Sequence, residues 1–171
     1  MRIRNKLLIG SAIPIVILII QIVVVNYFIR QLQSATTIIG GAQTVIEADF
    51  SAADHVSSLK EEIKKLPSVY DEPQESTHRL DSLALQLSAE IATILQFQSG
   101  ELDAEVAFSA VDSTYGRAQN ELAKTKLIAQ DGTSDLDTLI ERAIDTNIAF
   151  TALERSLSTL AVQLSSFCAR P

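Results

Sequence analysis

Residues 35–66, ATTIIGGAQTVIEADFSAADHVSSLKEEIKKL, decide the fold of this 171-residue chain. Positions at alternating steps of three and four residues form a seam in which nine of ten are apolar: Ala35, Ile38, Ala42, Val45, Asp49, Ala52, Val56, Leu59, Ile63 and Leu66. A seam of this period, sustained over more than four heptads, predicts a helix packed at the shallow crossing angle of helical bundles. Gly40-Gly41 weakens the helix by about 1 kcal/mol per glycine, yet the pattern continues through both.

Three basic residues and then 23 residues without a charge precede this seam. A helix crosses the hydrocarbon of a bilayer with roughly 20 mostly apolar residues, and the basic residues favour a cytoplasmic N-terminus. A cleaved secretory signal is the alternative, although its apolar core is usually shorter, about 7 to 15 residues. The sequence therefore predicts a protein of the bacterial inner membrane with three parts: a cytoplasmic basic tail at 1–6, a transmembrane helix in the lipid bilayer at 7–29, and an extracytoplasmic helical bundle at 30–171.

Three more apolar seams follow the first: Leu80, Ala84, Leu87, Ile91 and Ile94; then Ala104, Phe108, Val111, Tyr115, Ala118, Leu122, Thr125 and Ala129; and finally Leu139, Ala143, Thr146, Phe150, Leu153, Leu157, Leu160, Leu164 and Phe167. Pro67 and Pro73 end the first helix, because proline cannot donate to the helical ladder, and a second helix starts near Ser76 or Thr77. A single helix over 77–130 would be about 80 Å long and would overrun its neighbours. The predicted fold class is all-α, with the transmembrane helix continuing into an antiparallel up-down four-helix bundle of helices at about 30–65, 77–98, 101–130 and 135–169. Since a lone glycine breaks helices weakly, a bent three-helix arrangement is the alternative.

Composition argues against several classes of function. Beyond the tail and span, 11 basic residues face 21 acidic ones, a net charge near −10, so a nucleic-acid partner is not expected. Cys168 is the only cysteine, and His55 and His78 are the only histidines, so we expect no intramolecular disulfide and no zinc site. There is no phosphate-binding loop, nucleophile elbow or HExxH motif. We therefore expect no enzyme activity, no cofactor and no metal, with both histidines on the surface.

The opening MRIRNKLLIG resembles the short basic lead of bacterial methyl-accepting chemotaxis proteins and related transmembrane sensor proteins. The resemblance covers residues 1 to about 170, because one span and a bundle of matching length follow. It implies a homodimer whose outer bundle binds a small-molecule ligand and passes a displacement down the last helix. In that family a second span, a HAMP linker and a signalling domain come next. None is present here, so we expect a fragment or a truncated product.

Other functional classes stay open at this point. The chain can be the input region of a sensor histidine kinase or cyclase, whose catalytic part lies elsewhere. A membrane-anchored scaffold bundle that senses nothing is a second alternative, and it predicts no ligand-dependent thermal shift. A secreted bundle with a cleaved leader is the third.

No ligand-binding motif of the family matches the chain, so the candidate site residues are polar side chains near the seams. Asp49 is the foremost, because burying an unpaired carboxylate costs several kcal/mol. Heights along the bundle can be counted at about 1.5 Å per residue from the predicted turns that lie farthest from the membrane. This count places Tyr115 and Arg155 at about the same height as Asp49, and Asn147 farther from the membrane. We expect a polar layer that either lines a ligand pocket or only fixes the register of the helices.

Overall fold

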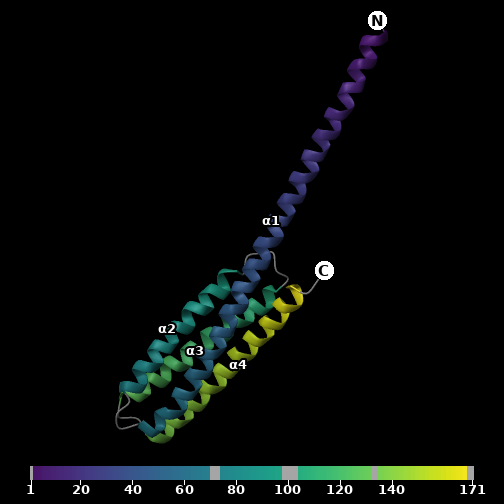
Figure 1. The fold of residues 1–171 in the computed structure, drawn as a ribbon. Coiled ribbons are helices and arrows are strands. Elements are labelled where there is room, and N and C mark those ends of the chain that lie inside the picture. Colours follow the sequence, from purple (N-terminus) through teal and green to yellow (C-terminus); the bar gives the residue numbers. More distant parts are fainter. Residues whose placement is uncertain (1, 70–73, 98–103, 132–134, 169–171) are drawn as a thin grey trace. The chain divides into compact units, whose positions relative to one another are not determined.

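The structure is a computed structural model of the whole chain, and it contains only helices in the part it describes. It describes the backbone of residues 2–69, 74–97, 104–131 and 135–168, and the side chains of these residues except 2–16, 34, 35, 37, 38, 167 and 168. The helices are α1 (Arg2–Lys65), the short 3₁₀ helix η1 (Leu66–Val69), α2 (Gln74–Gln96), α3 (Glu105–Asp131) and α4 (Leu136–Cys168) (Figure 1). The predicted all-α class is confirmed.

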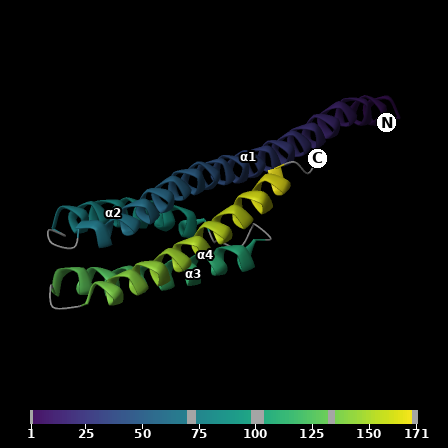
Figure 2. The ribbon, with the colours of Figure 1, turned by 90° about the horizontal axis from the view of Figure 1, so that it is seen from below.

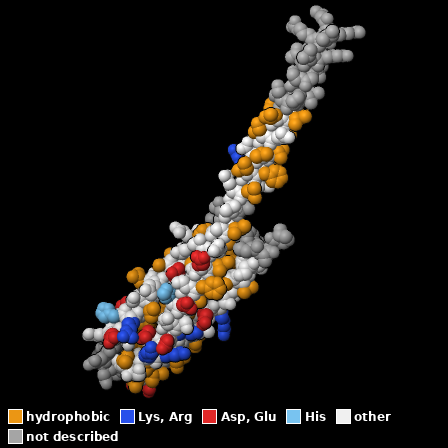
Figure 3. Space-filling view, viewed as in Figure 1, with side chains coloured by type: hydrophobic (Ala, Val, Ile, Leu, Met, Phe, Trp, Pro, Cys, Tyr) orange, Lys and Arg blue, Asp and Glu red, His pale blue; other side chains and the backbone are white. Residues whose placement is uncertain are grey.

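The chain divides into two compact units, Met1–Gly40 and Gly41–Pro171, and α1 runs through both. In the first unit, every large apolar side chain described between Ile17 and Leu32 is 46–64% exposed, and Figure 3 shows hydrophobic side chains on the visible face of this part of α1. Within the described part of the chain, no helix combines the length and the apolar character that crossing a membrane requires. The predicted span begins at Leu7, and the side chains of residues 7–16 lie outside the described ones.

In the second unit, the later part of α1 packs with α2, α3 and α4, as Figures 1 and 2 show. Its core is built from the seams. All eight described positions of the first seam are at most 3% exposed: Ala42, Val45, Asp49, Ala52, Val56, Leu59, Ile63 and Leu66. The other helices bury the apolar side chains of their own seams in the same way, among them Leu80, Ile91, Phe108, Val111, Phe150 and Leu157. Periodicity therefore identified the buried face of each helix, because burial of apolar area is the main favourable term in packing.

Helix boundaries differ from the sequence prediction in detail. α2 begins at Gln74, so Thr77 lies inside the helix, and its hydroxyl donates to the Gln74 carbonyl oxygen at 2.9 Å. α4 begins at Leu136, and the Asp135 carbonyl oxygen accepts its first helical hydrogen bond from Leu139 N at 3.2 Å. Four residues after α1 continue as the 3₁₀ helix η1 instead of turning at once. The helix α2 ends before α3 begins, so the bent three-helix alternative is wrong. The predicted break at 99–100, residues 132–134 of the predicted turn at 131–134, and the side chain of the seam residue Phe167 lie outside what the structure describes, whereas Asp131 is the last residue of α3.

Pairs of hydroxyl groups satisfy one another in the core between α3 and α4. The Oγ1 atoms of Thr125 and Thr146 are 2.7 Å apart and share a hydrogen bond, and both residues are fully buried. Thr114 Oγ1 and Ser156 Oγ form a second pair at 2.7 Å. Because a buried hydroxyl without a partner costs about 1–3 kcal/mol, these pairs allow polar side chains to occupy core positions.

A glycine allows close packing where α1 passes the end of α2. A Cβ atom added to Gly41 would overlap the ring of Phe97, whereas one added to its neighbour Gly40 would meet nothing within 4 Å. The lack of a side chain at Gly41 therefore makes room for the aromatic ring. The sequence predicts that the two glycines weaken the helix. At Gly41 the structure shows a further role, because only a residue without a side chain leaves room for the Phe97 ring.

We expect Gly41→Ala to lower the free energy of unfolding by about 1–3 kcal/mol, because the Phe97 ring must leave its site. Gly40→Ala is the matched control, and it should be neutral or stabilise by up to about 1 kcal/mol through helix propensity. Thermal unfolding of the full chain in detergent micelles, followed by circular dichroism, measures both. The double variant Gly41→Ala/Phe97→Leu should recover part of the loss. Equal effects of the two alanine substitutions would contradict this packing argument.

Candidate functional site

A groove runs along α1 and α4 in the second unit, with a volume of about 590 Å³. Its lining residues are Lys60 and Lys64 from α1, and Ile144, Asn147, Ile148, Thr151, Ala152 and Arg155 from α4. The volume falls within the range of about 300–1,000 Å³ that is usual for small-molecule sites. Seam residues hold both helices in place beneath the groove, because Ile63 on α1 and Leu153 on α4 are fully buried.

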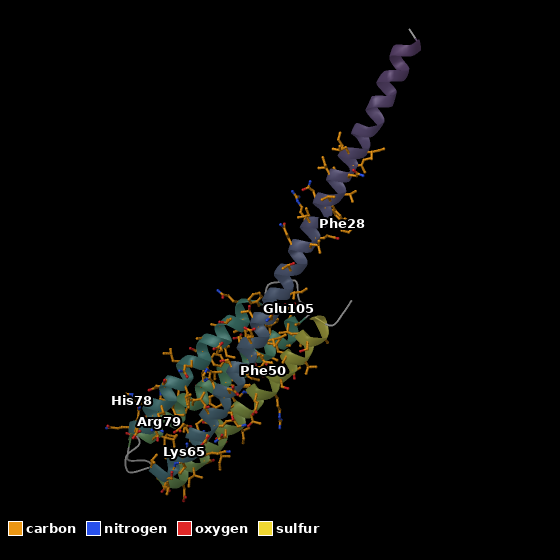
Figure 4. All side chains as sticks on the ribbon, in the orientation of Figure 1. Phe28, Phe50, Lys65, His78, Arg79 and Glu105 are labelled. Carbon is orange, nitrogen blue, oxygen red and sulfur yellow. The ribbon has the colours of Figure 1, made fainter. Side chains whose placement is uncertain are left out.

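The groove combines an apolar surface with basic side chains. Ile144 and Ile148 lie one turn apart on α4 and are 55% and 63% exposed. Most other large apolar residues of this helix are buried in the core. Lys60 Nζ forms an ion pair with Glu154 Oε2 at 2.7 Å. Lys64 and Arg155 have no ion-pair partner among the described residues. On the face shown in Figure 3, Lys and Arg side chains gather toward the end of the bundle where Lys65 lies, which Figure 4 labels.

Asn147 is half-buried in the groove wall and has one unpaired oxygen atom. Its Nδ2 donates to the Ala143 carbonyl oxygen at 3.0 Å. A carbonyl oxygen can only accept, so the amide nitrogen must be the atom that faces it. Asn147 Oδ1 is then the buried atom without a hydrogen-bond donor among the described residues.

Asp49 lies in the core of the bundle and does not line the groove. It is 3% exposed, and its Oδ1 has no hydrogen-bond donor among the described residues. Burial raises the pKa of the carboxyl group from 3.8 to about 7, because the charged form loses its hydration. Asp49 is therefore buried at its seam position, as the periodicity predicts. No described hydrogen bond or ion pair joins it to Tyr115 or Arg155.

Tyr115 is half-buried on α3 and interacts with α2. Burial raises the pKa of its phenol, while hydrogen bonds with Ser88 and Gln119 act in the opposite direction. Gln119 Nε2 donates to the phenolic oxygen. Arg155, by contrast, is exposed on α4. Of the four candidate residues, the structure brings Asn147 and Arg155 together in the groove, and it places Asp49 and Tyr115 elsewhere.

A smaller groove of about 250 Å³ lies between α3 and α4, and it shares Ile148 and Ala152 with the first. Two of its four charged residues pair with each other, since Arg142 Nη1 lies 3.5 Å from Asp145 Oδ2, and Glu121 pairs with Lys124, which does not line this groove. Within the described residues, no three His, Cys, Asp or Glu side chains come close enough together to hold a metal ion. The larger groove is therefore the candidate site.

Sequence reasoning missed both lysines and both isoleucines of the groove. Lys60 and Lys64 belong to a charged cluster at the end of the first predicted helix, where charged side chains are usually exposed to solvent. Ile144 and Ile148 carried a usable signal, because they are large apolar residues one turn apart that fall between the seam positions of α4. Comparisons of the chain with protein-family models, with curated proteins and with solved structures found no match.

Proposed function

We propose that the chain is the membrane-anchored, ligand-binding sensory region of a bacterial signal transducer of the chemotaxis type. The observation that carries this proposal is the exposure of apolar side chains around the whole circumference of α1 between Ile17 and Leu32. A helix that is apolar on all sides is stable inside a large protein or in a bilayer, but not in water. The same helix also supplies a buried seam to the bundle of the second unit.

An up-down antiparallel four-helix bundle is part of the proposal. In each of three successive helix pairs, residue numbers rise along one helix while those of the contacting residues fall along the next. Between α1 and the end of α2, Gly41 lies against Phe97 and Ser51 contacts Glu90. Between α2 and α3, Asp81 contacts Lys126 and Ser88 contacts Tyr115. Between α3 and α4, Thr114 contacts Ser156 and Thr125 contacts Thr146. This order supports opposite directions for neighbouring helices.

A homodimer with a small-molecule ligand completes the proposal. The resemblance to chemotaxis receptors implies the dimer, and two large apolar side chains on the surface of the second unit support it: Phe50 on α1 and Val162 on α4 are 66% and 67% exposed. Figure 4 labels Phe50 on α1. The groove between α1 and α4 supports ligand binding, since apolar surface and unpaired cations meet there.

The membrane anchor is tested by expressing the full chain in bacteria and washing the membranes at alkaline pH. We expect the chain to stay with the membranes, and added protease to digest the bundle in spheroplasts. Leu18→Arg with Ile19→Arg should release it, because each arginine near the bilayer centre costs about 2.5–3.5 kcal/mol. The matched control, Leu85→Arg with Leu127→Arg, changes exposed residues of the bundle and should not. Wild-type protein in the wash, or a bundle protected from protease, would contradict the anchored topology.

A further inference from the structure

The groove between α1 and α4 has a continuous apolar surface. Ile144, Ile148 and Ala152 follow one another at intervals of four residues, so they lie along one side of α4. From Ile144 to Arg155 the groove extends about 16 Å along the helix at 1.5 Å per residue. An elongated apolar body of a few carbon–carbon bonds, or a single ring with a short chain, fits this surface better than a compact polar molecule.

The charged residues that line this surface are all basic. No acidic residue is among the described residues that line the groove, although the chain as a whole carries a net charge of −7. Glu154 neutralises Lys60, while Lys64 and Arg155 have no ion-pair partner among the described residues. A guanidinium presents paired donors that match the two oxygens of a carboxylate. The complementary ligand therefore carries an acid group.

We propose that this groove binds a small amphipathic carboxylate, with its apolar body on Ile144, Ile148 and Ala152 and its acid group on Arg155. Lys64 adds a second positive charge along the same groove. The proposal rests on the proposed function in one respect, which is that the bundle binds a small molecule. It goes further by naming the ligand's chemical class and a site within one copy of the chain.

The test uses the full chain in lipid nanodiscs and phenylbutyrate as the probe, with binding measured by equilibrium dialysis against empty nanodiscs. We expect saturable binding that weakens as salt is added, because the ion pair is exposed to solvent. Arg155→Gln should weaken it at least about tenfold, the loss expected for one charge-assisted contact. Arg117→Gln is the matched control, since it removes an exposed arginine outside this groove and should leave binding unchanged.

The apolar half of the site has its own test. Ile148→Gln should weaken phenylbutyrate binding several-fold, whereas Leu127→Gln, at a residue that is 70% exposed on α3, should not. Phenylbutanol, which lacks the acid, should bind at least about tenfold more weakly than phenylbutyrate.

Other outcomes overturn the proposal. Equal binding of phenylbutyrate and phenylbutanol, or unchanged binding in Arg155→Gln, would remove the role of the charge. Preferential binding of phenylbutylamine would reverse the ligand's sign while leaving a sensory bundle intact. No binding of phenylbutyrate, with self-association that Ile148→Gln weakens, would assign the groove to a second copy of the chain. The membrane-wash experiment is independent of all these results, so failure of the anchor and failure of the ligand class can be told apart.

Discussion

Asp49→Leu is expected to raise the free energy of unfolding by about 4 kcal/mol above about pH 7. The carboxyl group is 3% exposed, and its Oδ1 has no donor among the described residues. Burial raises its pKa from 3.8 to about 7, and a shift of about three pH units corresponds to about 4 kcal/mol. Leucine removes this penalty and adds apolar surface to a seam that is otherwise apolar. Few single substitutions stabilise a protein by this much.

The pH dependence of stability separates this effect from simple repacking. Below about pH 3.8 the carboxyl is protonated in both states and has no effect on stability. Between about pH 3.8 and 7 the unfolded chain releases the proton while the folded chain keeps it, so stability falls as pH rises, by about 1.4 kcal/mol per pH unit. Above about pH 7 both states are ionised and the penalty is complete.

Thermal unfolding of the full chain in micelles, over a series of pH values, measures this slope. Asp49→Asn should be less pH-dependent than wild type between about pH 4 and 7, because the amide does not titrate. Asp54→Asn, at an exposed carboxyl on the same helix, is the matched control and should keep the wild-type slope. If the slopes of wild type and Asp49→Asn agree, the carboxyl group is not the source of the pH dependence.

The sequence was sufficient for the buried faces but not for the polar layer. Steps of three and four identify which side of a helix is buried, and Asp49 obeys this rule although it is charged. Counting residues from a turn gives the height of a side chain but not its direction around the helix axis. Arg155 lies between the seam residues Leu153 and Leu157 and is exposed, so it points away from the core, and its neighbour Glu154 pairs with Lys60 rather than lying beside Asp49.

Predicting the groove requires information that the sequence of a single helix does not contain. Lys60 and Lys64 become part of a site only because α1 lies against α4, where Lys60 meets Glu154. The pairing of helices that are far apart in the sequence follows from the packing of all four, which periodicity within each helix does not specify. Gly41 is similar: the sequence shows a weak point in a helix, and only the position of Phe97 shows why a side chain is excluded.

Phe150→Ala is expected to lower the free energy of unfolding by about 3–5 kcal/mol, the range for a buried phenylalanine. The side chain is 1% exposed on α4, and it is among the largest fully buried side chains described. Its removal leaves a cavity that helices anchored by neighbouring seam residues, such as Leu153, can close only in part. Because small domains have only about 5–15 kcal/mol in total, this change should reduce the melting temperature by roughly 10 °C.

Phe50→Ala is the matched control, because it deletes the same atoms from a side chain that is 66% exposed on α1. In the monomeric bundle its effect should stay within about 0.5 kcal/mol. If Phe50 instead lies in a homodimer interface, its removal should reduce stability more at high protein concentration, where the wild type is associated, than at low concentration, where neither protein is, since association stabilises the folded state by mass action. The effect of Phe150→Ala on the core should persist at every concentration. A loss for Phe50→Ala equal to that for Phe150→Ala, and independent of concentration, would show that the exposed and buried faces of α1 and α4 have been assigned wrongly.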